Sequence, residues 1–338
     1  MLDIFAGISQ WMADGERFAT ATVIKTWGSS PRPIGSVLAV NTKMEMLGSV
    51  SGGCIEGAVV RESIGVLESG KPKRITYGVS DEEAWEVGLS CGGSVEVFIE
   101  PFLSEGERWQ NLLAAVNNNQ ARVLISDMSG EGVNQILWGP DIDALGDDTS
   151  GERLALAAKA YRERKAQTVE IEGKAYFLQV FPRKSQMIIV GAAHITVDLV
   201  GLAQGFGFET IVIDPRGIFA EKTQFPLPPD HLHVDWPVEV LPQYKLDPYT
   251  YVVLLTHDPK IDDQALHEIL RADVAYIGAL GSKRTAAKRR ARLEAAGFSE
   301  EEIGRIYGPV GVSIRAKRPR EIALSIIAQV IEVQNAYL

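Results

Sequence analysis

Two cysteines stand beside paired glycines, an arrangement that can expose a thiol together with backbone amides. The segments are Gly52-Gly53-Cys54 and Cys91-Gly92-Gly93. Glycine permits positive φ and a close approach of the backbone, so each loop can turn N–H groups toward an anion. Cys54 also precedes a predicted helix, where the thiolate form is favoured, and a thiolate is a ligand for soft metals. The alternative is that each thiol is a small buried apolar group in a tight turn.

Two charged residues accompany these loops. Glu56 follows Cys54 by two residues and either orients a ligand, moves a proton, or serves as a first-turn carboxylate that the helix dipole favours. We favour the last of these interpretations. Arg32 lies between two prolines, which hold it in a rigid extended turn. Such a turn either presents the guanidinium to a phosphate or carries an ordinary surface arginine.

A phosphate-binding turn is predicted in the second half of the chain. Residues 186–190 are a continuous apolar run, typical of a strand buried on both faces, and Gly191 follows before a helical pattern from 194 onward. Amides at such a helix start favour phosphate. His194 stands in this first turn, where it either donates to a phosphate or carboxylate or is a polar surface residue.

The ribose end of this predicted site is marked by an acidic residue. Asp214 ends the second strand, where a carboxylate binds ribose hydroxyls in dinucleotide-binding folds. Arg216 either contacts a phosphate or pairs with Asp214. Ala193 and Thr196 occupy the positions of the second and third glycines of the dinucleotide pattern, and a Cβ at 193 pushes a pyrophosphate away. The turn therefore predicts either a nicotinamide cofactor or a Rossmann-like scaffold that binds another anion or none.

The elements that must position these residues change character near residue 183. The first part, 1–183, is predicted to be a mixed α+β domain, and the second, 184–338, a Rossmann-like doubly wound parallel sheet, because strands alternate with helices there. Expected helices cover 5–14, 56–69, 104–118, 152–165, 194–206 and 319–335. Expected strands cover 18–26, 36–41, 73–77, 94–100, 186–190, 209–214, 251–256 and 274–278, with a hairpin over 167–181.

Composition restricts the function further. The chain has 338 residues, of which 46% are hydrophobic, and a formal net charge of −10. An acidic chain of this kind argues against binding to nucleic acid or to an anionic membrane. No run approaches the roughly 18 apolar residues of a membrane span, and the first residues lack a basic leader. With only two cysteines, we expect a cytoplasmic protein without a disulfide framework.

Two basic clusters and one histidine–aspartate pair are further candidate sites. Lys283 and Arg284 follow a strand end, where a parallel sheet binds ligands, and could meet a phosphate. The rest of that helix and the cluster over 315–320 are predicted to be solvated faces. His257-Asp258 has no second histidine at ligand spacing, so we predict no metal site.

Several blocks in the same order resemble the XdhC/CoxI family of accessory proteins for molybdenum enzymes, over nearly the whole chain. The blocks are Gly28-Ser-Ser-Pro-Arg-Pro-Ile-Gly35, Gly48-Ser-Val-Ser-Gly-Gly-Cys-Ile-Glu56, Leu89-Ser-Cys-Gly-Gly93, Gly191-Ala-Ala-His194, Asp214-Pro-Arg216, Thr256-His-Asp258, 276–282 and 319–328. Two departures concern the second half. Ala193 replaces the family's second glycine, and Pro309-Val-Gly-Val-Ser-Ile-Arg-Ala316 replaces Pro-Ile-Gly-Leu-Asp-Ile-Gly-Ala.

The resemblance implies a maturation factor rather than an enzyme, with no catalytic residue. Such a protein would hold the molybdenum cofactor during sulfuration, with a cysteine desulfurase as partner, and deliver it to an apoprotein of the xanthine dehydrogenase type. The resemblance favours a functional Cys54 and leaves Cys91 open; a homo-oligomer is expected. The cofactor-binding candidates are Arg32, Gly52, Gly53, Cys54, Glu56, Cys91, Gly92, Gly93, Gly191, His194, Asp214 and Arg216.

Two other functions compete with the carrier. An NAD(P)-dependent oxidoreductase would use the Rossmann-like half, with His194 or His257 as proton donor. Ala193 and the lack of a clear acid–base pair argue against it. A regulatory module that binds a nucleotide is the other, and it gives the glycine–cysteine loops no role.

Overall fold

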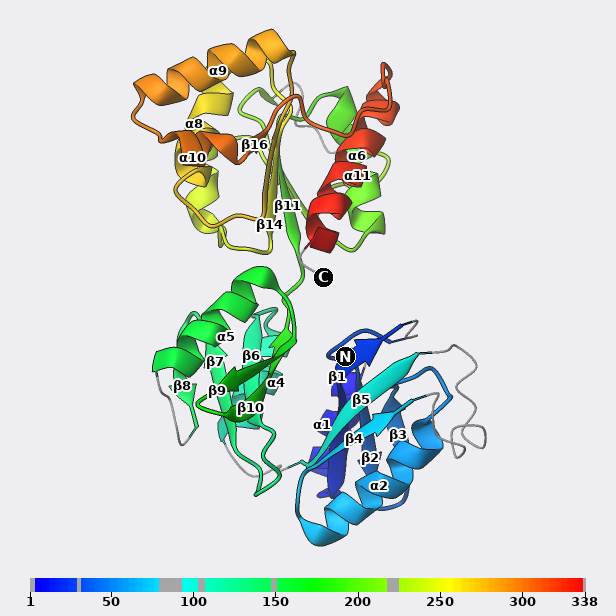
Figure 1. Ribbon diagram of the computed structural model, residues 1–338. Coiled ribbons are helices and arrows are strands. Elements are labelled where there is room, and N and C mark those ends of the chain that lie inside the picture. Colours follow the sequence, from blue (N-terminus) through cyan, green and yellow to red (C-terminus); the bar gives the residue numbers. More distant parts are fainter. Residues whose placement is uncertain are drawn as a thin grey trace. The chain divides into compact units, whose positions relative to one another are not determined.

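The computed structural model describes residues 4–28, 32–78, 93–102, 107–146, 151–217 and 225–336. The chain divides into two compact units, Met1–Arg183 and Lys184–Leu338 (Figure 1). The first unit is a mixed α+β structure and the second is a Rossmann-like parallel sheet, which confirms the predicted fold class. Within the described residues, no helix combines the length and the apolar character needed to cross a bilayer.

The first unit begins with an antiparallel sheet in the order β3-β2-β1-β5-β4. Its strands are β1 (Phe18–Trp27), β2 (Val37–Asn41), β3 (Met46–Gly48), β4 (Lys73–Tyr77) and β5 (Ser94–Pro101). The helix α2 (Glu56–Ser69) covers one face, where Ala21 and Val23 of β1 and Val97 of β5 join the apolar side of the helix in one buried cluster. Gly70 ends α2 in the left-handed conformation, as the sequence predicts.

A second antiparallel sheet completes this unit, in the order β8-β7-β6-β10-β9. The strands are β6 (Arg122–Asp127), β7 (Gln135–Gly139), β8 (Ile142–Leu145), β9 (Gln167–Ile171) and β10 (Lys174–Phe181). The helix α5 (Gly151–Glu163) contacts β6, β7 and β10. The sequence predicts the hairpin at its end but not a separate sheet, because alternating strands do not reveal their partners.

The two sheets face each other across a shared apolar layer. Because side chains alternate along a strand, β1 turns Phe18 and Ile24 toward the second sheet while it turns its alanines toward α2. The helices α1 (Phe5–Ala13) and α4 (Glu107–Asn117) close this layer, and Phe18 stacks on Phe102 with ring centroids 4.2 Å apart. Each such side chain stabilises the unit by about 2 kcal/mol. The layer therefore locks the two sheets together.

The second unit is a six-stranded parallel sheet in the order β13-β12-β11-β14-β15-β16. The strands are β11 (Gln186–Val190), β12 (Glu209–Ile213), β13 (His231–His233), β14 (Thr250–Leu254), β15 (Tyr276–Ala279) and β16 (Ile306–Tyr307). Order reverses between β11 and β14, and the carboxyl ends of strands at such a reversal form the usual ligand crevice. β13 and β16 were not predicted, because each has only two or three residues.

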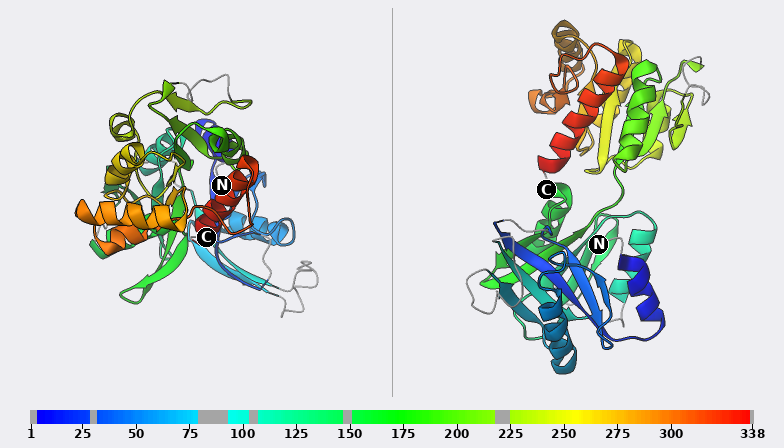
Figure 2. Two further views of the ribbon diagram at one scale, coloured as in Figure 1. Left: turned by 90° about the horizontal axis from the view of Figure 1, so that it is seen from above. Right: turned by 90° about the vertical axis from the view of Figure 1, so that its right-hand side faces the viewer.

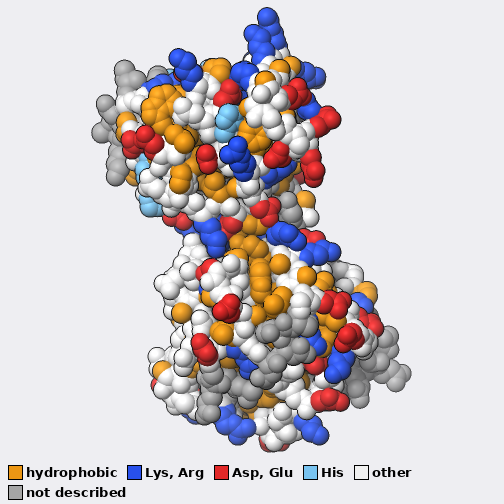
Figure 3. Space-filling view, turned by 90° about the vertical axis from the view of Figure 1, so that its left-hand side faces the viewer, with side chains coloured by type: hydrophobic (Ala, Val, Ile, Leu, Met, Phe, Trp, Pro, Cys, Tyr) orange, Lys and Arg blue, Asp and Glu red, His pale blue; other side chains and the backbone are white. Residues whose placement is uncertain are grey.

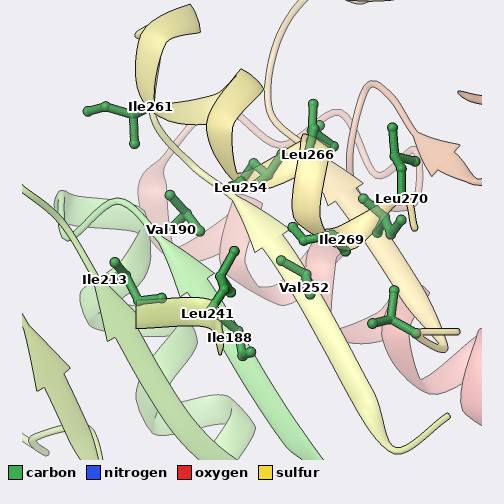
Figure 4. Packing of buried hydrophobic residues seen from close by; sticks show 14 of the residues in the cluster. Ile188, Val190, Ile213, Leu241, Val252, Leu254, Ile261, Leu266, Ile269 and Leu270 are labelled. Carbon is green, nitrogen blue, oxygen red and sulfur yellow. The ribbon is translucent and has the colours of Figure 1, made fainter. Parts of the chain in front are cut away.

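Helices cover both faces of the parallel sheet. The helices α6 (His194–Gly205) and α11 (Pro319–Ala336) lie side by side on one face (Figure 2). The other face is covered by α7 (Pro237–Val240), α8 (Pro259–Ile269), α9 (Lys283–Ala295) and α10 (Glu300–Gly304). Figure 4 shows the apolar packing on that face at Val190, Leu254 and Leu266. Burial on both faces explains the continuous apolar runs of β11 and β14.

Candidate functional site

The first candidate site lies at one end of the first sheet. Thr22 is paired with Val37 across the β1–β2 hairpin, so the turn carrying Arg32 projects beyond that end. Leu38 is paired with Gly48, which brings the segment after β3 to the same end, and Trp27 is paired with Ser94. The Arg32 turn, the glycine–cysteine loop and Gly93 therefore all lie at this end of the first sheet. Cys91 and Gly92 lie outside the described residues.

The Glu56 carboxylate organises the glycine–cysteine loop. Its Oε1 accepts hydrogen bonds from the Ser49 hydroxyl at 2.7 Å and from the amides of Val50 and Ser51 at 3.2 and 2.9 Å. Its Oε2 accepts from the amide of Gly53 at 2.8 Å and from the Ser51 hydroxyl. One side chain thus accepts hydrogen bonds from five donors of the loop. Three of these donors are backbone amides that could otherwise bind an anion.

The ionisation of Glu56 follows from these contacts. Burial acts to raise its pKa, but hydrogen bonds from the side chains of Ser51 and Ser49 and from the Ser51 amide lower the pKa to about 2. Glu56 is therefore ionised throughout the neutral range. Glu56 lies in the first turn of α2, as the interpretation based on the helix dipole requires. That interpretation did not include its hydrogen bonds to the preceding loop.

Cys54 is half-buried, and its side chain packs against the apolar cluster beneath α2. The glycines before it adopt positive φ, 76° at Gly52 and 117° at Gly53. A Cβ placed on Gly53 would meet no atom within 4 Å, so the backbone is open on that side. The packing of the thiol on the core agrees with the apolar alternative, and the open backbone beside it leaves a ligand-binding role as a prediction.

The Arg32 turn is held by its own glycine. Gly35 has a φ of 88° and its amide donates to the carbonyl of Val23 at 2.8 Å. A Cβ at Gly35 would lie 3.1 Å from Nε2 of Gln179 in β10, so the turn packs closely on the second sheet. At the same end of the first sheet Trp27 is 43% exposed, with the Lys25 ammonium 4.5 Å from its ring centroid. Arg32 itself is half-buried.

The second candidate site is the turn after β11. Gly191 has a φ of 108°, and a Cβ there would lie 2.9 Å from Cγ2 of Thr256 and 3.1 Å from the backbone of Leu255. Only glycine fits this approach of two strand ends. Thr196, at the position of the third glycine, donates its hydroxyl to the Gly191 carbonyl at 2.5 Å. The threonine at the third glycine position is thus accommodated by a hydrogen bond within the turn.

Asp214 is buried and its carboxylate is engaged by the chain itself. Oδ2 accepts from the amide of Ala192 at 2.8 Å and from Nη2 of Arg216 at 2.9 Å, and Oδ1 accepts from the amide and Nε of Arg216 at 3.0 and 2.9 Å. Burial acts to raise the pKa of Asp214, but these bonds outweigh it and lower the pKa. Of the two predicted roles of Arg216, pairing with Asp214 is the one that the contacts support.

The start of α6 offers donors without a side-chain cap. Ala193 is the N-cap residue, with φ −79° and ψ −174°, and its side chain makes no capping hydrogen bond. Uncapped amides and the helix dipole favour an anion there. His194 and His257 are both exposed. Asp258 caps α8 by accepting from the amide of Lys260 at 2.9 Å, which gives it a structural role.

No group of three or more His, Cys, Asp or Glu side chains among the described residues lies where it could hold a metal ion.

Two residues of the first site were missed from the sequence. Ser49 and Ser51 supply both hydroxyl donors to Glu56, and their spacing before a helix that begins with glutamate was the available signal. Arg289 was predicted on a solvated face and is instead buried, because it pairs with Asp262.

Comparisons with known proteins cover both units. Residues 11–78 match the sequence profile of the XdhC and CoxI family, and residues 187–330 match the XdhC Rossmann domain. The chain is 25% identical to a Bacillus subtilis (strain 168) protein described as a probable xanthine dehydrogenase subunit, over 96% of this chain and 95% of that protein. It is also 25% identical to the molybdenum cofactor insertion chaperone PaoD of Escherichia coli (strain K12), over 96% of this chain and 85% of PaoD.

Among solved structures, the chain is similar to a protein of Bacillus halodurans that is described as a xanthine dehydrogenase. The TM-score is 0.63 at 27% sequence identity, and the match covers 98% of this chain and 96% of the other. The similarity therefore extends through both units.

Proposed function

The chain belongs to the XdhC and CoxI family, and we propose that it binds the molybdenum cofactor as an accessory protein. In this proposal it holds the cofactor for sulfuration by a cysteine desulfurase and delivers it to an apoprotein of the xanthine dehydrogenase type. The name of the Escherichia coli relative, an insertion chaperone, supports an accessory role, and that of the Bacillus subtilis relative supports an association with xanthine dehydrogenase. The observation that carries the proposal is that the family's first two blocks, around Arg32 and around Cys54, follow strands that end at the same end of the first sheet.

The residues at that end fit the chemistry of the cofactor. A thiol is a soft donor suited to molybdenum, and Cys54 stands beside glycines whose backbone is open to approach. Arg32 lies on the neighbouring turn, and a guanidinium suits a phosphate group. Glu56 binds no ligand in this proposal; it fixes the loop that carries Cys54. When bound, the cofactor supplies the molybdenum centre that the client enzyme later uses.

The geometry does not support an NAD(P)-dependent oxidoreductase. In such an enzyme Asp214 would accept ribose hydroxyls, but its two oxygens already receive bonds from Ala192 and Arg216. Ala193 adds a Cβ where the pyrophosphate would approach the backbone. A nucleotide bound in the usual way would have to break the Asp214–Arg216 pair.

The experiment is production of the full chain in a host that makes the molybdenum cofactor. The purified protein is oxidised and assayed for the fluorescent pterin and for molybdenum, beside Cys54→Ser, which keeps the size of the side chain and removes the soft donor. We expect pterin and molybdenum with the wild type and a loss of both with Cys54→Ser. Wild-type protein without pterin would overturn the proposal.

The matched control is Ser69→Ala, a change of similar size at the far end of α2. Ser69 is the last residue of that helix and is exposed. Its variant should carry as much pterin as the wild type, because the change is remote from the loop. Equal amounts of pterin in the wild type and in Cys54→Ser would show that the thiol does not take part in binding the cofactor.

A further inference from the structure

A cavity of about 190 Å³ lies beside α9 in the second unit, and its lining shares no residue with the turn at Gly191. Residues of α9, α10, β16 and the position after β16 line it, and they include Ala286, Ala287, Arg289, Arg290, Ile303 and Gly308. The described lining thus contains two guanidinium groups and no carboxylate. Its place agrees with that of a ligand pocket, since α9 follows the carboxyl end of β15 and Gly308 follows that of β16.

Arg289 supplies the main polar group of this cavity. It is only 3% exposed. Its two hydrogen bonds to described residues leave from Nη2, to Oδ2 of Asp262 at 3.3 Å and to the carbonyl of Leu280 at 2.9 Å. Within the described residues its buried Nε has no hydrogen-bond partner. Nη1 lies on the Gly308 side, because a Cβ placed on Gly308 would be 3.9 Å from it.

An incompletely bonded buried guanidinium favours an external acceptor. A buried donor without an acceptor costs about 1–3 kcal/mol, and a ligand oxygen that reaches it recovers that free energy. The second guanidinium, of Arg290, pairs with Glu294 and Glu300 at 3.0 and 2.8 Å. Both carboxylates are exposed, and such pairs contribute little, so Arg290 can turn toward a ligand.

The surroundings favour an anion over other ligands. Lys283, Arg284 and Lys288 are exposed on α9, the helix that contributes four residues to the lining. Figure 3 shows blue Lys and Arg side chains gathered at the end of this unit where α9 lies, at the top of the view. This local positive charge stands out in a chain with a net charge of −10 and would draw small anions to the cavity.

We propose that this cavity binds a phosphate group through Arg289 and Arg290. A guanidinium presents a planar set of donors that matches the oxygens of phosphate, and two of them can share one tetrahedral anion. The site is separate from the turn at Gly191, because β14 and β15 lie between β11 and β16. The phosphate comes either from free inorganic phosphate or from a small phosphate ester.

The test is calorimetric titration of the full chain with inorganic phosphate at constant ionic strength. The deciding variant is Ala287→Glu, because Ala287 is exposed on α9 and lines the cavity. A carboxylate there pairs with the guanidinium groups and repels the ligand, so we expect at least about tenfold weaker binding, or about 1.4 kcal/mol. The control is Ala295→Glu, which makes the same charge change at an exposed position of α9 outside the lining.

Arg289→Lys is a second variant, which keeps a cation near Asp262 and reduces the number of N–H donors. It should also weaken phosphate binding, and circular dichroism checks that it folds. A parallel titration with glycerol 3-phosphate separates the two sources: tighter binding than inorganic phosphate supports an ester, and weaker binding supports the free ion. Absence of phosphate binding, or binding that Ala287→Glu leaves unchanged, would overturn the proposal, since phosphate at the Gly191 turn would not respond to that variant.

Discussion

Asp214 and Arg216, two positions apart after β12, are joined by two side-chain hydrogen bonds of 2.9 Å, and the carboxylate they share is buried. Arg216 thus bonds the two carboxylate oxygens with which the acidic residue of a dinucleotide-binding Rossmann domain would hold ribose. The same carboxylate also accepts from the amide of Ala192 in the turn after β11. In this chain the acidic residue thus fastens two strand ends together, which is a structural role.

Replacement of Arg216 tests this role. We expect Arg216→Met to lower the free energy of unfolding of the second unit by about 2 kcal/mol at neutral pH, because Asp214 stays buried and loses its charged donors. Urea unfolding measures the change. Arg284→Met, at an exposed position of α9, is the control and should cost less than about 0.5 kcal/mol. Equal effects of the two variants would contradict a structural pair.

The Glu56 carboxylate gives a prediction for the first unit. Glu56→Gln keeps one oxygen, but its Nε2 cannot accept from the Gly53 amide or the Ser51 hydroxyl as Oε2 does. We expect a loss of about 1–2 kcal/mol in urea unfolding. The wild type should also lose stability as the pH falls from the ordinary pKa of 4.5 toward the folded pKa of about 2, because a depressed pKa stabilises only the ionised form. A pH dependence there that is the same in Glu56→Gln would refute this account.

Glu100 should give the stability of the first unit the opposite dependence on pH. It is buried between the two sheets, and burial raises its pKa to about 7, against hydrogen bonds from Gln135 and Ser126 that lower it. The folded state therefore holds a proton that the unfolded state releases above about pH 4.5, so stability should fall as the pH rises toward 7.

Glu100→Gln removes that dependence. At pH 8 the variant should be more stable than the wild type by on the order of 3 kcal/mol, and near pH 4.5 the two should differ little. Denaturation curves at the two pH values measure this. A variant that is destabilised equally at both would show that the wild-type carboxylate is ionised and well paired.

The glycine that opens the Rossmann turn is tested by a matched pair in the second unit. Gly191→Ala places a Cβ 2.9 Å from Thr256 at a φ of 108°, and we expect it to cost about 2–3 kcal/mol in thermal or urea unfolding. Gly201→Ala lies inside α6, where a Cβ meets no atom within 4 Å, and should stabilise by up to about 1 kcal/mol. Equal stability of the two variants would contradict the claim that the strand ends approach Gly191 too closely for a side chain.

Much of the fold could be predicted because its signals are local. The apolar run of β11 and the glycine after it mark a parallel strand and its turn, and Gly70 marks the end of α2. The partners of side chains were not predictable in the same way. For Arg216 the sequence offered pairing with Asp214 as one of two alternatives, and the contacts decide between them. That Glu56 holds the loop before it and that Arg289 is buried against Asp262 depend on burial and on tertiary contacts, which residue spacing does not encode.

The central claim is that the glycine–cysteine loop at the end of the first sheet holds the molybdenum cofactor, and two alanine variants of neighbouring glycines test it most directly. Gly53 has a φ of 117° in the loop, whereas Gly57 lies in α2 with no atom within 4 Å of a Cβ and tolerates alanine. Cofactor released from a purified molybdoenzyme is added without air to each variant, and the pterin that elutes with the protein on gel filtration is measured. The account predicts pterin with the wild type and Gly57→Ala and little with Gly53→Ala. Equal pterin with all three, or none with the wild type, would contradict it.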